Sequence, residues 1–265
     1  MATVREVYQY LDGLSPFSLQ MDFDNAGFLV GRGEQSADKI LVALDITEEV
    51  AAEAARLGAG LIVSHHPVIF HPVRAITDSD PTGRVLLMLA EQKIAAICAH
   101  TNLDAVSGGV NDALAAKLGL EELELLQPAG IDASGRPYGI GRVGMVKGAP
   151  VYAPAFAAFV KEVLGANGVR YVDAHRPVRR VAVGGGACGD MITDALSLGC
   201  DTFVTADVKY NGFLDAAALG INLIDAGHFP TENVVIPVLC RWLASGFPNA
   251  EIISSQCHKE VFSYA

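Results

Sequence analysis

The sequence predicts an α/β protein made of two internally similar, interlinked halves. Short apolar strands alternate with amphipathic helices, a pattern typical of parallel strands joined by helical crossovers. Related blocks recur in the two halves, and polar turns that contain histidine follow several of the strands. Because open α/β sheets bind ligands at the carboxyl ends of their strands, we expect two α/β domains that face each other across a cleft, with the functional site in that cleft.

The composition indicates a compact folded protein. The 265 residues suffice for one large or two ordinary domains, and 51% of them are hydrophobic against 18% charged. No apolar run reaches the roughly 18 residues of a membrane span, and the first residues lack the pattern of a signal peptide. The five cysteines contain no Cys-x-x-Cys pair, which disfavours a disulfide frame or a zinc knuckle. We therefore expect a cytoplasmic protein without membrane contact.

The charge balance restricts the partners. The formal net charge is −11 at pH 7. A broad nucleic-acid surface needs clustered Lys and Arg to displace counterions, so this balance disfavours one. An acidic protein also concentrates cations near its clefts, which favours metal binding weakly.

Helices and strands can be placed from apolar periodicity and capping residues. The expected elements are a helix over 3–14, a strand over 28–30, and strand, helix and strand over 40–44, 47–57 and 61–63; then helix 83–92, strand 94–99, helix 110–118, helix 154–164, strands 169–172 and 181–183, helix 190–198, strands 203–205 and 222–224, and a helix with Pro230 in its first turn that continues through Trp242. Residues 121–150 are richest in Gly and Pro, which predicts the domain boundary there. The predicted domains are 1–125, completed by 230–265, and 126–229.

Two ungapped matches suggest a duplication. At one offset the strand segments Ile40–Val42 and Ile62–Ser64 align with Val181–Val183 and Phe203–Thr205. At another, His100-x-x-x-Asp104 aligns with His228-x-x-x-Glu232, each directly after an apolar strand. Both halves therefore run strand, helix, strand, and then strand and His-x-x-x-carboxylate.

Ser64-His65-His66-Pro67 lies at the end of a strand that is predicted to be buried. Adjacent imidazoles there are hard to explain by packing, since each neutral ring needs both a donor and an acceptor partner. A regular strand would send His65 and His66 to opposite faces. Both can serve one centre only if the strand has already bent; otherwise they serve two ions.

The turns together supply a candidate metal site, formed by His65, His66, Asp104, His228 and Glu232, with His100 close by. Five ligands are too many for one open zinc and suit two ions that share a carboxylate. Nitrogen and oxygen donors without thiolate suit divalent Zn, Mn, Fe, Co or Ni. Such a pair holds a bridging water and makes a hydroxide nucleophile at neutral pH. Taken alone, Glu232 also fits a carboxylate at the amino end of the following helix.

Other motifs leave alternatives open. Gly184–Gly189 matches the Gly-x-Gly-x-x-Gly of a dinucleotide fold, with Asp207 at the end of the next strand, but Asp190 would repel a pyrophosphate there. A tight strand-to-helix turn is the simpler interpretation. The polar turn Asp22–Asn25 is either Asx-turn chemistry before a strand or part of a site. Lys209 and Tyr210 are interpreted as a surface pair, with contact to an anionic substrate as the alternative. The remaining histidines are interpreted as lying on the surface or behind the ligands; these are His71, His175 and His258.

Several motifs of the sequence resemble those of a known family, the dinuclear metal-centre proteins related to NGG-interacting factor three, often labelled GTP cyclohydrolase 1 type 2 homologues. The matching blocks are Asp24-Asn25-Ala26-Gly27 with Val30-Gly31, Ser64-His65-His66-Pro67, His100-Thr101-Asn102-Leu103-Asp104, Gly139-Ile140-Gly141-Arg142-Val143-Gly144, Asp207-Val208-Lys209-Tyr210 and Asp225-Ala226-Gly227-His228-Phe229-Pro230-Thr231-Glu232. They occur in the expected order over nearly the whole chain, whose length resembles the family's short form.

The resemblance implies a ligand assignment and an assembly. It implies His66 and Asp104 on one ion, His65 and His228 on the other, and Glu232 touching both. It also implies a ring-shaped homohexamer, a trimer of dimers with its metal sites facing an internal cavity. Two positions depart from the family pattern: Phe23 stands where a Trp is usual, and Asn211 where a His often follows the Lys-Tyr pair.

We therefore expect a metal-dependent hydrolase that acts on a nucleotide, as a GTP cyclohydrolase does, or on another phosphorylated small molecule. The nucleophile would be a metal-bound hydroxide, and His100 would be the catalytic proton partner behind it. The alternative is a non-catalytic protein that binds, delivers or senses metal.

Overall fold

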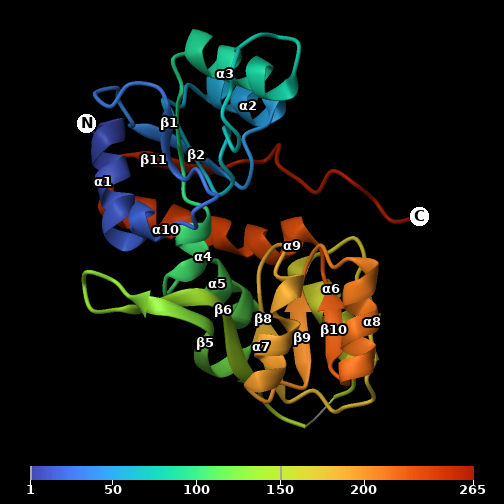
Figure 1. The fold of residues 1–265 in the computed structure, drawn as a ribbon. Coiled ribbons are helices and arrows are strands. Elements are labelled where there is room, and N and C mark those ends of the chain that lie inside the picture. Colours follow the sequence, from blue (N-terminus) through green and yellow to red (C-terminus); the bar gives the residue numbers. More distant parts are fainter. Residues whose placement is uncertain (1, 150) are drawn as a thin grey trace. The chain divides into compact units, whose positions relative to one another are not determined.

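The computed structural model describes residues 2–149 and 151–265, which form two compact units (Figure 1). Unit 1 comprises the chain up to Leu103 together with Ile236–Lys259, and unit 2 comprises Asp104–Val235 together with Glu260–Ala265. These divisions differ from the predicted domain ends after residues 125 and 229. The difference arises because the segment from 104 to 125 packs and pairs within unit 2.

Unit 1 is built on a five-stranded sheet. Its strand order is β1-β4-β3-β2-β11, and all neighbours are parallel except β1, which runs antiparallel to β4. The strands are β1 (Gly27–Val30), β2 (Lys39–Ala43), β3 (Leu61–Ser64), β4 (Ala95–Cys98) and β11 (Glu251–Ser254). Strands β2, β3 and β4 are buried along almost their whole length, as expected of central parallel strands.

Helices cover both faces of this sheet. They are α1 (Val4–Leu14), α2 (Glu48–Leu57), α3 (Pro81–Glu91) and α10 (Ile236–Gly246), with a 3₁₀ turn η1 (Phe17–Leu19). Side chains of α2 and α3 pack with Leu41 and Ile62 in one core cluster, and α1 and α10 lie on the opposite face (Figure 1). The predicted capping is confirmed in α2, because Thr47 accepts a hydrogen bond from Val50 N and Gly58 adopts a left-handed conformation.

Unit 2 is built on a six-stranded sheet of order β5-β6-β8-β9-β10-β7. The strands are β5 (Leu120–Ile131), β6 (Pro137–Val146), β7 (Arg170–Val172), β8 (Arg180–Val183), β9 (Thr202–Thr205) and β10 (Asn222–Asp225). Strands β8, β9 and β10 are parallel, and β6 and β7 flank them in the antiparallel direction. The helices are α5 (Val110–Lys117), α6 (Ala153–Leu164), α7 (Ile192–Ser197), α8 (Tyr210–Leu219) and α9 (His228–Glu232), with 3₁₀ turns η2 (Gly189–Met191) and η3 (Asn233–Val235); α4 (Thr101–Ala105) begins in unit 1 and ends in unit 2.

The predicted domain boundary at 121–150 is wrong for the segment that the structure describes, because this segment lies within unit 2. Most of it forms the long β5–β6 hairpin (Figure 1). Its glycines permit close strand packing: a Cβ at Gly139 would lie 2.1 Å from the carbonyl oxygen of Gln127, and one at Gly144 would lie 2.9 Å from that of Glu121. The glycine content therefore reflects tight pairing within a sheet.

The helix predicted around Pro230 also differs. Gly227, with φ of 86°, starts α9 at His228, so Pro230 lies in the first turn, as expected. The helical path then tightens at η3 before α10. Glu232 is the last residue of α9. It lies directly before η3 and α10, so its place along the chain fits both a charge near a helix start and a metal ligand.

The two units share one topology, which confirms the predicted similarity of the halves. In unit 1 the order β1-β4-β3-β2 repeats in unit 2 as β7-β10-β9-β8, with the first strand antiparallel in both. The ends of the strands also match, because Ala99 N donates to Ser64 O in unit 1 and Ala226 N donates to Thr205 O in unit 2. Within residues 2–149 and 151–265, no helix has the length and apolar character that crossing a membrane requires.

Candidate metal centre

In unit 1 three histidines converge at the carboxyl ends of β3 and β4. Strand β3 ends at Ser64, and His66 N donates to Leu44 O while the Ser64 hydroxyl donates to His66 O, so the chain has already bent at the pair. Consequently His65 and His66 need not point to opposite faces. Ligand atoms of His65, His66 and His100 lie within 4.8 Å of one another. Residue His100 thus belongs to the group itself.

The Nδ1 atom of each ring faces an oxygen that can only accept a proton. His65 Nδ1 lies 2.8 Å from Ala99 O, His66 Nδ1 lies 2.7 Å from Asp45 Oδ1, and His100 Nδ1 lies 2.7 Å from Asp24 Oδ1. A carbonyl or carboxylate oxygen fixes the tautomer with its proton on Nδ1, which places the ring's lone pair on Nε2. Metal-ligating histidines show this arrangement almost without exception.

Asp24 shows that the polar turn before β1 belongs to the site. Its side chain accepts hydrogen bonds from Thr101 N at 3.0 Å and from the Thr101 hydroxyl, besides facing His100. Burial raises the pKa of Asp24, but the hydrogen bonds from His100 and Thr101 prevail and hold this pKa at about 2. The carboxylate therefore stays ionised and keeps His100 in one tautomer.

Asp45 connects His66 to the C-terminal segment. Its second oxygen lies 2.8 Å from His258 Nε2, and the His258 side chain is only 8% exposed. Burial raises the pKa of Asp45, but the hydrogen bonds of His258 and His66 lower it well below its usual range. Glu53 anchors the same segment, because it accepts from the Ser255 hydroxyl and from Gln256 N. His258 thus lies behind a candidate ligand, as the sequence allowed, whereas Asp45 was missed although it follows the carboxyl end of β2.

In unit 2 the candidate donors are Asp104, His228 and Glu232. His228 Nε2 lies 3.0 Å from Glu232 Oε2, one helical turn along α9, and a ligand oxygen of Asp104 lies within 4.8 Å of one of Glu232. Both carboxyl residues are buried, Asp104 with 9% and Glu232 with 3% of its surface exposed. Two buried carboxylates this close repel each other unless a cation or a proton compensates them. The set is therefore suited to a cation.

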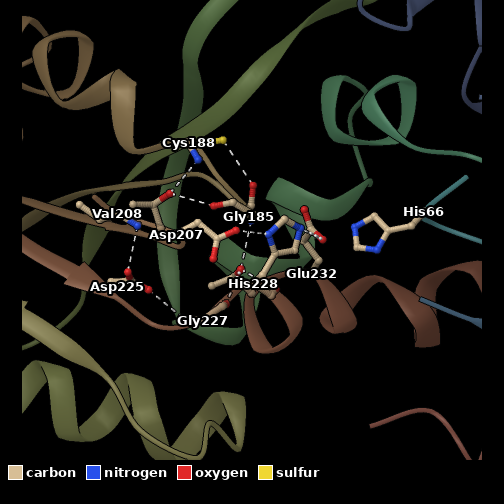
Figure 2. A network of polar contacts seen from close by, with 12 residues as sticks. His66, Gly185, Cys188, Asp207, Val208, Asp225, Gly227, His228 and Glu232 are labelled. Carbon is tan, nitrogen blue, oxygen red and sulfur yellow. Dashed lines mark hydrogen bonds and ion pairs between the residues drawn. The ribbon is translucent and has the colours of Figure 1, made fainter. Parts of the chain in front are cut away.

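The histidine of unit 2 is oriented like those of unit 1. Figure 2 shows the His228 ring between Asp207 and Glu232, and His228 Nδ1 lies 2.7 Å from Asp207 Oδ2. Asp225 fixes the two backbone segments that carry this pair, because it accepts from Val208 N at 3.0 Å and from Gly227 N at 3.2 Å. Asp207 is itself held at a φ of 53°, a left-handed conformation that Asp tolerates better than most residues. The sequence indicated Asp207 as a possible dinucleotide contact and as part of a family block, but not as the residue that orients His228.

The glycine turn Gly184–Gly189 packs against Glu232. Gly185 N donates to Asn111 Oδ1 at 3.0 Å and Gly186 N donates to Thr231 Oγ1 at 3.1 Å, so these N–H groups are engaged within the protein and do not form a phosphate cradle. At Gly186, where φ is 68°, a Cβ would lie 2.1 Å from Glu232 Oε1. The simpler interpretation of a tight turn lining the site therefore prevails over dinucleotide binding.

Comparison with known proteins identifies the family of the chain. The family model for Duf34/NIF3 (NGG1p interacting factor 3) matches residues 2–260. The chain belongs to this family. A relative in Clostridium perfringens, named GTP cyclohydrolase 1 type 2 homolog, is 35% identical over 98% of this chain and 99% of its own. A relative of the same name in Streptococcus pneumoniae is 31% identical over 98% of both chains. The crystal structure of a Bacillus cereus protein related to NIF3 superposes with a TM-score of 0.94 at 27% identity, covering 100% of this chain and 99% of the other.

In this Duf34/NIF3 member, the other candidate residues are set apart from the donor groups. His71, His175, Lys209 and Tyr210 are exposed. Cys188 lies within the glycine turn, and burial, assisted by the negative charges of Asp104 and Glu232, raises the pKa of its thiol. The thiol is therefore protonated near neutral pH, which leaves nitrogen and oxygen donors for a metal. Such donors fit the divalent Zn, Mn, Fe, Co or Ni expected from the sequence.

Proposed function

We propose that the donor groups of the two units combine to hold two divalent transition-metal ions. In this proposal His66 and Asp104 hold one ion, His65 and His228 hold the other, and Glu232 contacts both. Covalent continuity supports the combination, because the chain passes from His100 directly through α4 to Asp104. The buried carboxylates support it as well, since oxygen donors of Asp104 and Glu232 lie close together, as a divalent cation requires.

The observation that carries this proposal is the shared orientation of the three imidazoles assigned as ligands. His65, His66 and His228 each turn Nδ1 to a carbonyl or carboxylate oxygen 2.7 to 2.8 Å away. Packing alone has no reason to place three lone pairs on Nε2. A metal centre requires this, because it needs deprotonated nitrogens held in one orientation.

We further propose that the centre serves a metal-dependent hydrolase acting on a nucleotide or a related phosphorylated compound. Two bound ions would supply an activated water and a Lewis acid. Within the chain, His100 is suited to accept or return a proton at Nε2, because Asp24 faces its Nδ1 and holds the ring in one orientation. The names of the Clostridium and Streptococcus relatives support a nucleotide substrate.

Metal content and product formation test this function together. Protein purified without added metal should contain about two ions per chain. It should convert GTP, or one of a panel of phosphoesters, only while the ions are present. His100→Ala should keep the ions and lose turnover, which separates a proton partner from a ligand. Turnover that persists in metal-stripped protein would reject the hydrolase, and a metal-loaded protein without turnover on the whole panel would favour metal storage or delivery.

We also propose that the chain assembles as a homohexamer. Helix α8 supports self-association, because it exposes the apolar side chains Tyr210, Leu214 and Leu219 by 78%, 53% and 49%. Light scattering should then give six times the chain mass of 27.9 kDa. A monomeric mass would reject the assembly.

A further inference from the structure

Two phenylalanine rings stand exposed beside His100 in unit 1. Phe23 is 64% and Phe70 is 40% exposed, and their ring centroids lie 6.4 Å apart at an interplanar angle of 65°. The Phe70 ring also lies edge-on to the His100 ring, with centroids 6.0 Å apart. The large apolar faces of both rings are thus left to solvent next to a candidate metal centre, where folding gains little from them.

One tripeptide fixes both rings and the histidine. Phe23 carries the first ring, Asp24 faces His100 Nδ1 at 2.7 Å, and the side-chain amide of Asn25 donates to Ile69 O at 2.5 Å, next to Phe70. Hydrogen bonds therefore connect the loop of Phe23 to the loop of Phe70 and to His100, although both phenyl rings are exposed. Such anchoring prepares a rigid contact surface and lowers the ordering cost of binding.

We propose that Phe23 and Phe70 form a stacking surface for the flat heteroaromatic ring of the substrate, which in the proposed function is the base of a nucleotide. This inference rests on that proposed function and names the part of the substrate that unit 1 binds. Phenyl faces carry no hydrogen-bonding groups, so they attract any planar π-system and discriminate weakly among bases. The base would lie against the rings while the reacting atoms reach His100.

Paired ligands with and without a base test the stacking surface. Calorimetry on metal-loaded protein should show that each of the four nucleoside monophosphates binds more tightly than ribose 5-phosphate. Phe23→Ala and Phe70→Ala should each weaken the binding of a nucleoside monophosphate about 5- to 100-fold. They should leave metal content and ribose 5-phosphate binding unchanged. Phe23→Trp should retain the affinity, because it keeps an aromatic face.

A matched control comes from the same loop region. Ile76 is 52% exposed but has no ring, and Ile76→Ala should leave nucleotide affinity unchanged. The proposal is overturned if bases add no affinity, if the Phe variants match wild type, or if they weaken ribose 5-phosphate equally. A loss of assembled mass in both Phe variants, with affinity retained, would instead assign the rings to a protein contact. Base-dependent binding without any turnover would overturn only the hydrolase, whereas turnover with unaffected Phe variants would overturn only the stacking surface.

Discussion

The two units place different residues on one scaffold. In unit 1 the second parallel strand, β3, ends in Ser64-His65-His66, and both histidines join the donor group. In unit 2 the equivalent strand, β9, ends in Thr205 and leads to Asp207, which orients His228 from behind. The same position along the sheet thus supplies donors in one unit and a supporting carboxylate in the other. The two units share the frame, while the chemistry of their turns differs.

The turns after β4 in unit 1 and β10 in unit 2 differ less from each other. His100 follows Ala99 directly, whereas Gly227 separates Ala226 from His228. The extra glycine, at a φ of 86°, lets His228 open α9 and brings its Nε2 within 3.0 Å of Glu232. We therefore expect Glu232 to contribute more to metal binding than Asp104, although the two residues occupy equivalent positions in the sequence pattern.

The largest effect should therefore come from Glu232. Glu232→Gln keeps the volume but removes the charge that we assign to both ions, so metal content should fall from about two ions per chain to below one. Asp104→Asn should lose only about one ion. Elemental analysis of both variants, with folding checked by circular dichroism, measures the difference. Equal losses would mean that the two carboxylates are equivalent after all.

Gly186→Ala should disturb Glu232 without touching any donor. The new Cβ would lie 2.1 Å from Glu232 Oε1 at a φ of 68°. Gly199→Ala in the same unit is the matched control, because its φ is 75° and nothing lies within 4 Å of its Cβ. Backbone strain should lower the free energy of unfolding by about 1–2 kcal/mol in both variants. Only Gly186→Ala should lose metal. Equal metal contents in the two variants would show that the glycine turn does not support the metal site.

The supporting carboxylates should matter less than the donors. Asp45→Ala and Asp207→Ala should each lower metal affinity about 10- to 100-fold, because His66 and His228 lose the acceptors that orient them. Chelator competition measures this affinity. Asp190→Ala removes an exposed carboxylate from unit 2 and controls for the change in charge. If Asp190→Ala weakens binding as much, the effect is long-range electrostatics and not orientation.

The smallest effect on the metal site is expected in the C-terminal segment of unit 1, where stability depends on pH. Burial raises the pKa of Glu53, but the hydrogen bonds from Ser255, Gln256 and Cys257 prevail and lower it. The stabilisation is therefore complete above the ordinary pKa of 4.5 and is lost as the pH falls through the lower pKa of the folded state. Glu53→Gln should lower the free energy of unfolding by about 1–3 kcal/mol at neutral pH. Urea unfolding should show this difference shrinking in acid, and a difference independent of pH would contradict the role of the charge.

Much of this account could be predicted from sequence, and the failures have physical causes. The central strands and helices follow apolar periodicity, and the five donors and His100 follow from residue types that buried turns rarely hold. The β5–β6 hairpin was missed because Gly139 and Gly144 indicate breaks locally, whereas they permit close packing against a strand. Asp45 was missed, and the role of Asp24 and the contact of Gly186 with Glu232 were left open, because their partners lie far along the chain or appear only in three dimensions.

Anomalous diffraction from crystals of the metal-loaded protein tests the central claim most directly. The account predicts two peaks per chain about 3.5–4 Å apart. One peak should lie near Nε2 of His66 and a carboxylate oxygen of Asp104, the other near Nε2 of His65 and His228, and Glu232 should reach both. A single peak bound by residues of one unit, or peaks away from these nitrogens, would contradict a centre built jointly by the two halves.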